Sequence, residues 1–170
     1  MKISEITVSN FRSFGPTPLT IELSDTTCLV GTNGSGKSAV LVAMSKLFGL
    51  SETERAISKS DFHIPIEPED EEVEERSLAI EVRVEFPELK GPDGASLRAI
   101  PECFNQMIIE DVGSDPYCRI RLEAKWTATN VSEGDIEQAI YWIEGRSLFV
   151  NAMGKLMTAP VSALDGIVGE

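Results

Sequence analysis

The most constraining feature of this sequence is a glycine-rich segment that leads into a helix with an apolar stripe. Gly31–Ser38 (Gly-Thr-Asn-Gly-Ser-Gly-Lys-Ser) fits the P-loop pattern of Gly, four residues of any type, then Gly-Lys-Ser or Gly-Lys-Thr. The apolar run Cys28-Leu29-Val30 precedes it and predicts a short, buried parallel strand. Gly49 stands where a helix C-terminal glycine belongs. Between loop and glycine, apolar residues recur at helical spacing: Val40, Leu41, Met44, Leu47 and Phe48. Strand, loop and helix in this order predict a nucleoside triphosphate site.

Each residue type in the loop has a physical role in holding phosphate. Glycines let the backbone turn so that successive N–H groups face phosphate oxygens at a helix start, where the helix dipole favours negative charge. Lys37 is the candidate catalytic residue, expected to reach the β- and γ-phosphates as a point charge. The Ser38 hydroxyl is the candidate metal ligand, for Mg²⁺. The predicted nucleotide-binding residues of the loop are Gly31, Asn33, Gly34, Ser35, Gly36, Lys37, Ser38 and Ala39.

The apolar pattern outside the P-loop predicts strands rather than helices. Met1–Phe14 and Leu19–Leu23 read as an antiparallel hairpin that precedes the loop. Leu78–Phe86 and Tyr117–Trp126 alternate apolar and polar residues, and Ile136–Ile143 is a candidate to pair with the strand before it. The predicted fold class is therefore α/β, with a largely antiparallel β-subdomain beside the P-loop strand and helix.

Charge and cysteine content narrow the possible partners. The net charge of the 170 residues is −13, and Glu67–Glu75 holds seven acids in nine residues, which predicts a solvated acidic loop insert at about 65–76. This balance argues against broad DNA binding by this segment, because such binding needs Lys and Arg to neutralise phosphates. Three scattered cysteines, no secretion signal and no apolar run of membrane-spanning length predict a cytoplasmic protein with reduced thiols and no membrane contact.

The order of these segments resembles the start of ABC-type ATPase heads of the SMC/RecF class. Asn10–Phe14 (Asn-Phe-Arg-Ser-Phe) ends the first strand, a hairpin strand follows, and the P-loop comes next. Two further segments, Ser60–His63 and Tyr117–Trp126, resemble the OLD (overcoming lysogenisation defect) family of ATP-dependent endonucleases. The resemblance implies ATP and Mg²⁺ as cofactors and places Arg12 near the nucleotide, as a phosphate or base contact. The alternative for Arg12 is a surface arginine in a turn.

Membership of the OLD family would imply more than this chain contains. It implies an ATP-dependent endonuclease in DNA processing or phage defence, which dimerises through its ATPase heads around ATP and cuts DNA with a distal Toprim domain. The sequence shows no apolar strand ending in Asp-Glu and no Leu-Ser-Gly-Gly signature, and neither Gln106 nor Gln138 is well placed as a Q-loop glutamine. We therefore expect residues 1–170 to be the N-terminal ATP-binding lobe of a longer protein, inactive alone.

Other interpretations stay open on the residues alone. The main alternative is an SMC/RecF-type ATPase for DNA repair or structural maintenance, without nuclease activity. A P-loop kinase fits less well, because kinases alternate strands and helices. His63 is the single histidine of the chain, and a lone histidine is more often structural or exposed than catalytic. A basic stripe of Arg119, Arg121 and Lys125 could contact DNA, although Glu123 among them favours a solvated sheet face.

Overall fold

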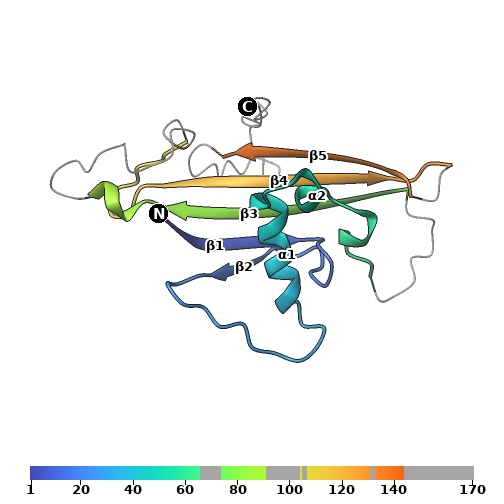
Figure 1. Cartoon of the computed structure of the whole chain (residues 1–170), viewed down its shortest axis with the longest axis horizontal. Helices are drawn as coiled ribbons and strands as arrows, with labels where there is room; N and C mark the ends of the chain where they lie inside the picture. The colour runs from blue at the N-terminus through green and yellow to red at the C-terminus, as the bar shows by residue number, and fades with distance from the viewer. Residues whose placement is uncertain (66–73, 91–103, 105–106, 131–132, 144–170) are drawn as a thin grey trace, which may run out of the picture.

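The computed structural model of the chain centres on one five-stranded antiparallel sheet (Figure 1). It describes residues 1–65, 74–90, 104, 107–130 and 133–143. The strand order is β2-β1-β3-β4-β5, so the hairpin formed by the first two strands extends the sheet on one side. The strands are β1 (Lys2–Ser9), β2 (Leu19–Glu22), β3 (Glu75–Glu85), β4 (Tyr117–Thr127) and β5 (Asp135–Trp142). The predicted α/β class, the N-terminal hairpin and the three later strands are confirmed.

The sheet has one apolar face and one polar face. β3 and β4 pair in continuous register from Glu75 opposite Thr127 to Glu85 opposite Tyr117. Because side chains alternate along a strand, the same register puts every second residue of both strands on the core side. The buried core residues of these two strands are Leu78, Ile80, Val82, Val84, Cys118, Ile120, Leu122, Ala124 and Trp126. Tyr117 is also buried, but it lies on the opposite face, where the Arg83 guanidinium covers its ring. Ile6 and Val8 of β1 continue this core toward the hairpin.

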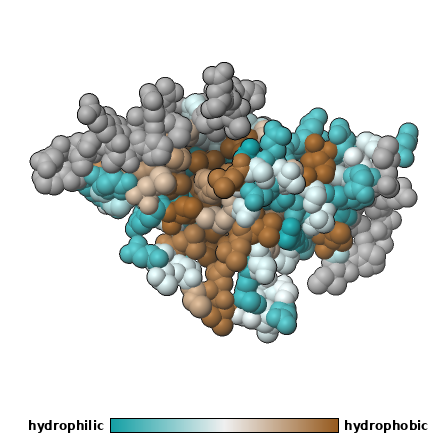
Figure 2. All heavy atoms as spheres, viewed as in Figure 1, coloured by the Kyte–Doolittle hydropathy of each residue, from teal (hydrophilic) through white to brown (hydrophobic). Residues whose placement is uncertain are grey.

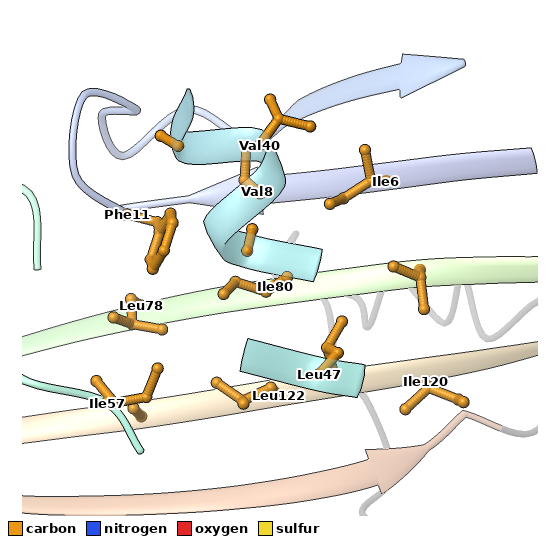
Figure 3. Close-up of a cluster of buried hydrophobic side chains, with 14 of the residues drawn as sticks. Ile6, Val8, Phe11, Val40, Leu47, Ile57, Leu78, Ile80, Ile120 and Leu122 are labelled. Atoms are coloured by element: carbon orange, nitrogen blue, oxygen red, sulfur yellow. The ribbon is translucent and has the colours of Figure 1, made fainter. Parts of the chain in front are cut away.

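Helix α1 (Lys37–Phe48) crosses the apolar face of the sheet (Figures 1 and 3). Its buried residues are Ala39, Val40, Ala43 and Leu47, and the alanines let the helix lie close to the strands. The predicted helix is confirmed, but the predicted buried stripe is only partly right. Leu41 is 65% exposed and Phe48 is 41% exposed. The helix is apolar on two sides, so its periodicity alone did not identify the side that meets the sheet. Figure 2 shows apolar residues at the surface in the middle of the view, where α1 crosses the sheet in Figure 1.

Gly49 ends α1 for a reason other than backbone conformation. Its φ is −56°, which any residue can adopt, and its N–H donates to the Ser45 carbonyl at 2.8 Å. A Cβ at this position would lie 2.6 Å from the Ser45 carbonyl oxygen and 2.6 Å from the Glu54 Cβ. The glycine is therefore required by close approach of the next turn of chain, not by a left-handed cap.

One local prediction is wrong, one short helix was not predicted, and one predicted insert is described only in part. The segment Cys28–Val30 forms no strand, and Val30 is 87% exposed, because the five described strands pair with one another and none of them lies beside it. A short helix, α2 (Glu52–Arg55), was not predicted, although Ser51 and Glu54 form a capping box. Of the predicted acidic insert, residues 66–73 lie outside the described residues, while Glu75 and Arg76 belong to β3.

None of the helices in the described ranges is both long enough and apolar enough to span a bilayer.

Candidate nucleotide-binding site

The P-loop, Gly31–Ser38, runs directly into the first turn of α1. Two of its glycines have left-handed backbone, Gly34 at φ 84° and Gly36 at φ 93°. Gly36 is also the N-cap of α1, and a Cβ there would meet the Phe14 ring at 2.7 Å. Glycine is thus required twice at this position, once by conformation and once by space. The loop remains on the surface otherwise, since Gly31–Ser35 and Ser38 are exposed.

The helix start offers free backbone donors. The first turn of α1 is closed by the Val40 N–H, which donates to the Gly36 carbonyl at 3.0 Å, and the Ser35 N–H donates to the Thr32 carbonyl at 3.3 Å. The N–H groups of Gly36, Lys37 and Ser38 find no acceptor within the part of the chain that the structure describes. Unpaired donors at a helix N-terminus attract anions, and the helix dipole adds to this attraction.

The Lys37 ammonium lies in the curve of its own loop. Its Nζ donates to the carbonyl oxygens of Gly31 at 2.8 Å and Thr32 at 2.6 Å, with the Ser35 Oγ at 3.5 Å. These acceptors are neutral, so a phosphate oxygen would be a stronger partner for the same protons. Ser38 is exposed on the first turn, where its hydroxyl is accessible to a cation. Donors, ammonium and hydroxyl therefore suit a phosphate group with its metal ion.

A second turn packs against the end of this loop. It spans Asn10–Gly15 and is closed by the Asn10 N–H, which donates to the Gly15 carbonyl at 2.8 Å. Its Phe14 ring and Ser13 Oγ approach the backbone of Gly36 so closely that a Cβ there would lie 2.7 and 3.0 Å away. Asn10 and Arg12 both have φ 51°, a conformation that non-glycine residues adopt at some energetic cost. The shape of this turn sets the space around the P-loop.

Arg12 is bound on both its backbone and its side chain by Asp61. Its Nε and Nη2 each lie 2.8 Å from the Asp61 Oδ1, and its N–H donates to the Asp61 carbonyl at 2.8 Å. The Arg12 side chain is 37% exposed, whereas that of Asp61 is fully buried. The structure therefore places Arg12 in the turn that packs on the P-loop, with its guanidinium on Asp61. A contact between Arg12 and nucleotide stays a prediction.

Asp61 belongs to the short 3₁₀ helix η1 (Lys59–Asp61), and its second oxygen has three further partners. Oδ2 accepts from the Ser58 N–H at 3.0 Å and the Ser58 hydroxyl at 3.0 Å, and pairs with Lys46 Nζ at 3.2 Å. Burial by itself would raise the pKa of this carboxyl, but the bonds from Ser58, Arg12 and Lys46 together lower the pKa below its ordinary value. Asp61 lies within Ser60–His63, the segment that resembles the OLD family, but no role was predicted for this residue. A local sequence signal for its position is the capping pattern from Ser58 to Asp61.

Two residues considered at the sequence level have structural roles. His63 Nδ1 lies 2.7 Å from the Arg12 carbonyl, and the His63 N–H donates to Asn10 at 2.9 Å, so this histidine braces the Asn10–Gly15 turn. Gln138 on β5 accepts from the Ile57 N–H at 2.8 Å. Gln106 lies outside the described residues.

The basic stripe on β4 is neutralised by acids on the same sheet face. Arg119 pairs with Glu81, Arg121 lies 2.8 Å from Glu123 and 3.7 Å from Glu81, and Lys125 lies 2.7 Å from Glu75. The interpretation as a solvated sheet face is therefore better supported than a DNA contact. In the described ranges no three His, Cys, Asp or Glu side chains come together as a metal site.

Comparison with known proteins places this fold and loop among the P-loop ATPases. A family model described as an AAA ATPase domain matches residues 1–138, and the chain belongs to that family. No curated protein matches the chain at a significant level. Among solved structures, one from work on ATP-driven dimerisation and DNA-stimulated activation of SMC ATPases aligns with 84% of this chain and 69% of its own. Its sequence identity is 20% and its TM-score 0.43, so the family assignment rests on the family model.

Proposed function

We propose that Gly31–Ala39 binds the triphosphate of ATP together with Mg²⁺. The observation that carries this proposal is the position of Lys37. Its ammonium lies inside the loop at 2.6–2.8 Å from two neutral carbonyls, beside N–H groups of the helix start that have no acceptor in the described chain. A triphosphate would supply the negative charge that these groups lack.

The residues of the site divide the work of binding. The N–H groups at the start of α1 would orient the phosphates, and Lys37 would move its hydrogen bonds from its own loop to phosphate oxygens. Ser38 would hold the metal ion through its hydroxyl, and the ion would supply positive charge to offset that of the phosphates. Arg12 is a further candidate contact, because its turn touches Gly36.

We further propose that the site serves an OLD-like, ATP-dependent DNA endonuclease that dimerises through its ATPase heads. Support comes from Ser60–His63, which resembles the OLD family, and from Asn10–Phe14, which resembles the SMC/RecF class, because the two segments meet beside the P-loop. Phe11 pairs with Phe62 in an isolated antiparallel bridge, and Arg12 pairs with Asp61. DNA would be bound by other parts of the full-length protein, since the polar sheet face described here carries its own counter-charges.

The test is Lys37→Ala, with Mg²⁺–ATP binding measured by calorimetry. Loss of the charge-assisted contacts between the Lys37 ammonium and the phosphate oxygens should weaken ATP binding at least about tenfold. Lys125→Ala, a lysine on the polar sheet face, is the matched control and should bind as the wild type does. ATP affinity retained in Lys37→Ala would count against the site.

The same pair of variants, made in the full-length protein, tests the proposal that it is an ATP-dependent endonuclease. We expect ATP-dependent nicking of plasmid DNA that Lys37→Ala abolishes and Lys125→Ala keeps. ATP-dependent DNA binding without any cleavage would instead identify an SMC/RecF-type protein without nuclease activity.

A further inference from the structure

One buried carboxylate connects both ends of the P-loop helix. Asp61 is the one charged side chain that is buried among the described residues, and it is fully enclosed. Its Oδ1 forms an ion pair with the Arg12 guanidinium. Its Oδ2 forms an ion pair with the Lys46 ammonium and accepts a hydrogen bond from the Ser58 hydroxyl. The two cations come from different elements, so the carboxylate links parts of the fold that share no other ion pair in the described chain.

The first connection leads to the start of α1. Asp61 holds Arg12 through the side chain and through the backbone, each at 2.8 Å. The next two residues, Ser13 and Phe14, are those that abut Gly36, the N-cap of α1 and the last glycine of the P-loop. A shift of Arg12 would therefore move the wall against which the loop rests.

The second connection leads to the end of α1. Lys46 lies in the last turn of the helix, where its Nζ pairs with Asp61 at 3.2 Å and also donates to the Ala56 carbonyl. Asp61 thus fixes the helix at Lys46 and the loop at Gly36 from a single point. Displacement of either end changes the angle at which the helix N-terminus presents its donors.

We propose that Asp61 is a positioning residue of the nucleotide site, which holds Arg12 and Lys46 so that the P-loop keeps its phosphate-binding shape. This inference rests on the proposed ATP site. Stability alone accounts poorly for a buried carboxylate, because apolar residues of similar volume are often as stabilising as a buried ion pair. The left-handed backbone at Asn10 and Arg12 points the same way, since such conformations persist where surrounding contacts enforce them.

The experiment is Asp61→Asn, compared with wild type for folding and for Mg²⁺–ATP affinity. Asparagine keeps the shape of the side chain and can still accept from Ser58, but it loses the charge that orients Arg12 and Lys46. We expect a folded protein whose Kd for ATP rises about tenfold. Phe86→Leu, at a buried residue that directly follows β3, is the control for general destabilisation and should leave the Kd unchanged.

Lys46→Met supplies a second, independent variant if Asp61→Asn does not fold. It removes the connection from Asp61 to the helix end, together with the bond from Lys46 to the Ala56 carbonyl, and leaves Arg12 paired with Asp61. It should also raise the Kd for ATP. A folded Asp61→Asn or Lys46→Met protein with wild-type affinity would overturn the inference while leaving the ATP site intact. Failure of the proposed site is distinguishable, because then wild type would bind no ATP or Lys37→Ala would bind like wild type.

Discussion

At the scale of single residues, the behaviour of Asp61 follows from the balance between burial and hydrogen bonding. A carboxylate removed from water loses hydration, which favours its protonated form. Here the Arg12 guanidinium, the Lys46 ammonium and two Ser58 donors replace that hydration. The donors prevail and the pKa of Asp61 falls below its ordinary value. The folded state therefore holds the Asp61 carboxylate more strongly than the unfolded chain does.

This lowered pKa predicts a defined pH dependence of stability. Since the pKa of Asp61 is lower in the folded state, its contribution to the free energy of unfolding is present above about pH 4, the pKa of an unfolded aspartate. The contribution is lost as the pH falls from there through the folded pKa. Urea unfolding of wild type and Asp61→Asn should differ by a constant amount from pH 5 to pH 7 and converge below about pH 4. A difference that grows on acidification would contradict this assignment.

Among single residues, the sequence was most informative where a motif imposes its own geometry. Lys37 lies within the predicted loop because spacing in a P-loop fixes the backbone around it. The partners of Asp61 could not be identified in this way, because Arg12 and Lys46 are distant in the sequence and meet Asp61 only in the folded protein. No local pattern records such a meeting.

At the scale of elements, α1 is placed by contacts at its two ends. Its start depends on Gly36, whose backbone lies under Phe14, and its end on Gly49, whose backbone lies between Ser45 and Glu54. The Glu54 carboxylate also accepts from the N–H groups of Leu50 and Ser51, which holds α2 against the end of α1. The helix is thus fixed by close backbone approach, and small side chains at these points are structural requirements.

Substitution Gly49→Ala tests this arrangement. The added Cβ would meet the Ser45 carbonyl oxygen and the Glu54 Cβ, both at 2.6 Å, so helix end and α2 must separate. We expect a loss of about 1–3 kcal/mol in the free energy of unfolding, measured with urea. Gly113→Ala is the comparison, because it has φ 94° but open space around the Cβ, and backbone strain alone should cost about 1–2 kcal/mol. An unchanged stability in Gly49→Ala would show that the two helices are not tightly joined.

Elements with regular alternation were predictable, and those defined by distant partners were not. β3 and β4 were recognised because their apolar residues repeat with period two and one face is buried. Cys28–Val30 has the composition of a buried strand, but a strand forms only where a neighbour pairs with it. The capping box at Ser51 was present in the sequence and would have indicated α2.

At the scale of the whole molecule, the sheet separates two kinds of interaction. On the face covered by α1, apolar side chains from β1, β3 and β4 form one core cluster with the helix. On the other face, Glu81 of β3 accepts a hydrogen bond from Arg119 of β4 and forms a longer ion pair with Arg121 of the same strand. The order β2-β1-β3-β4-β5 was not predictable, because alternation assigns faces to strands but does not choose their neighbours.

A pair of substitutions on opposite faces of the sheet should therefore have unequal effects. Leu122 is fully buried on β4, and Leu122→Ala should lower the free energy of unfolding by about 2–5 kcal/mol, because the substitution leaves a cavity beneath α1. Glu81→Gln removes the partner of Arg119 and Arg121 on the polar face and should cost about 1 kcal/mol, because these side chains are 15–30% exposed and water partly replaces the lost pairs. Urea unfolding of both variants provides the comparison, and raised salt should narrow the smaller effect only. Equal losses would mean that the polar face is covered in the native protein, and that the sheet is buried on both sides.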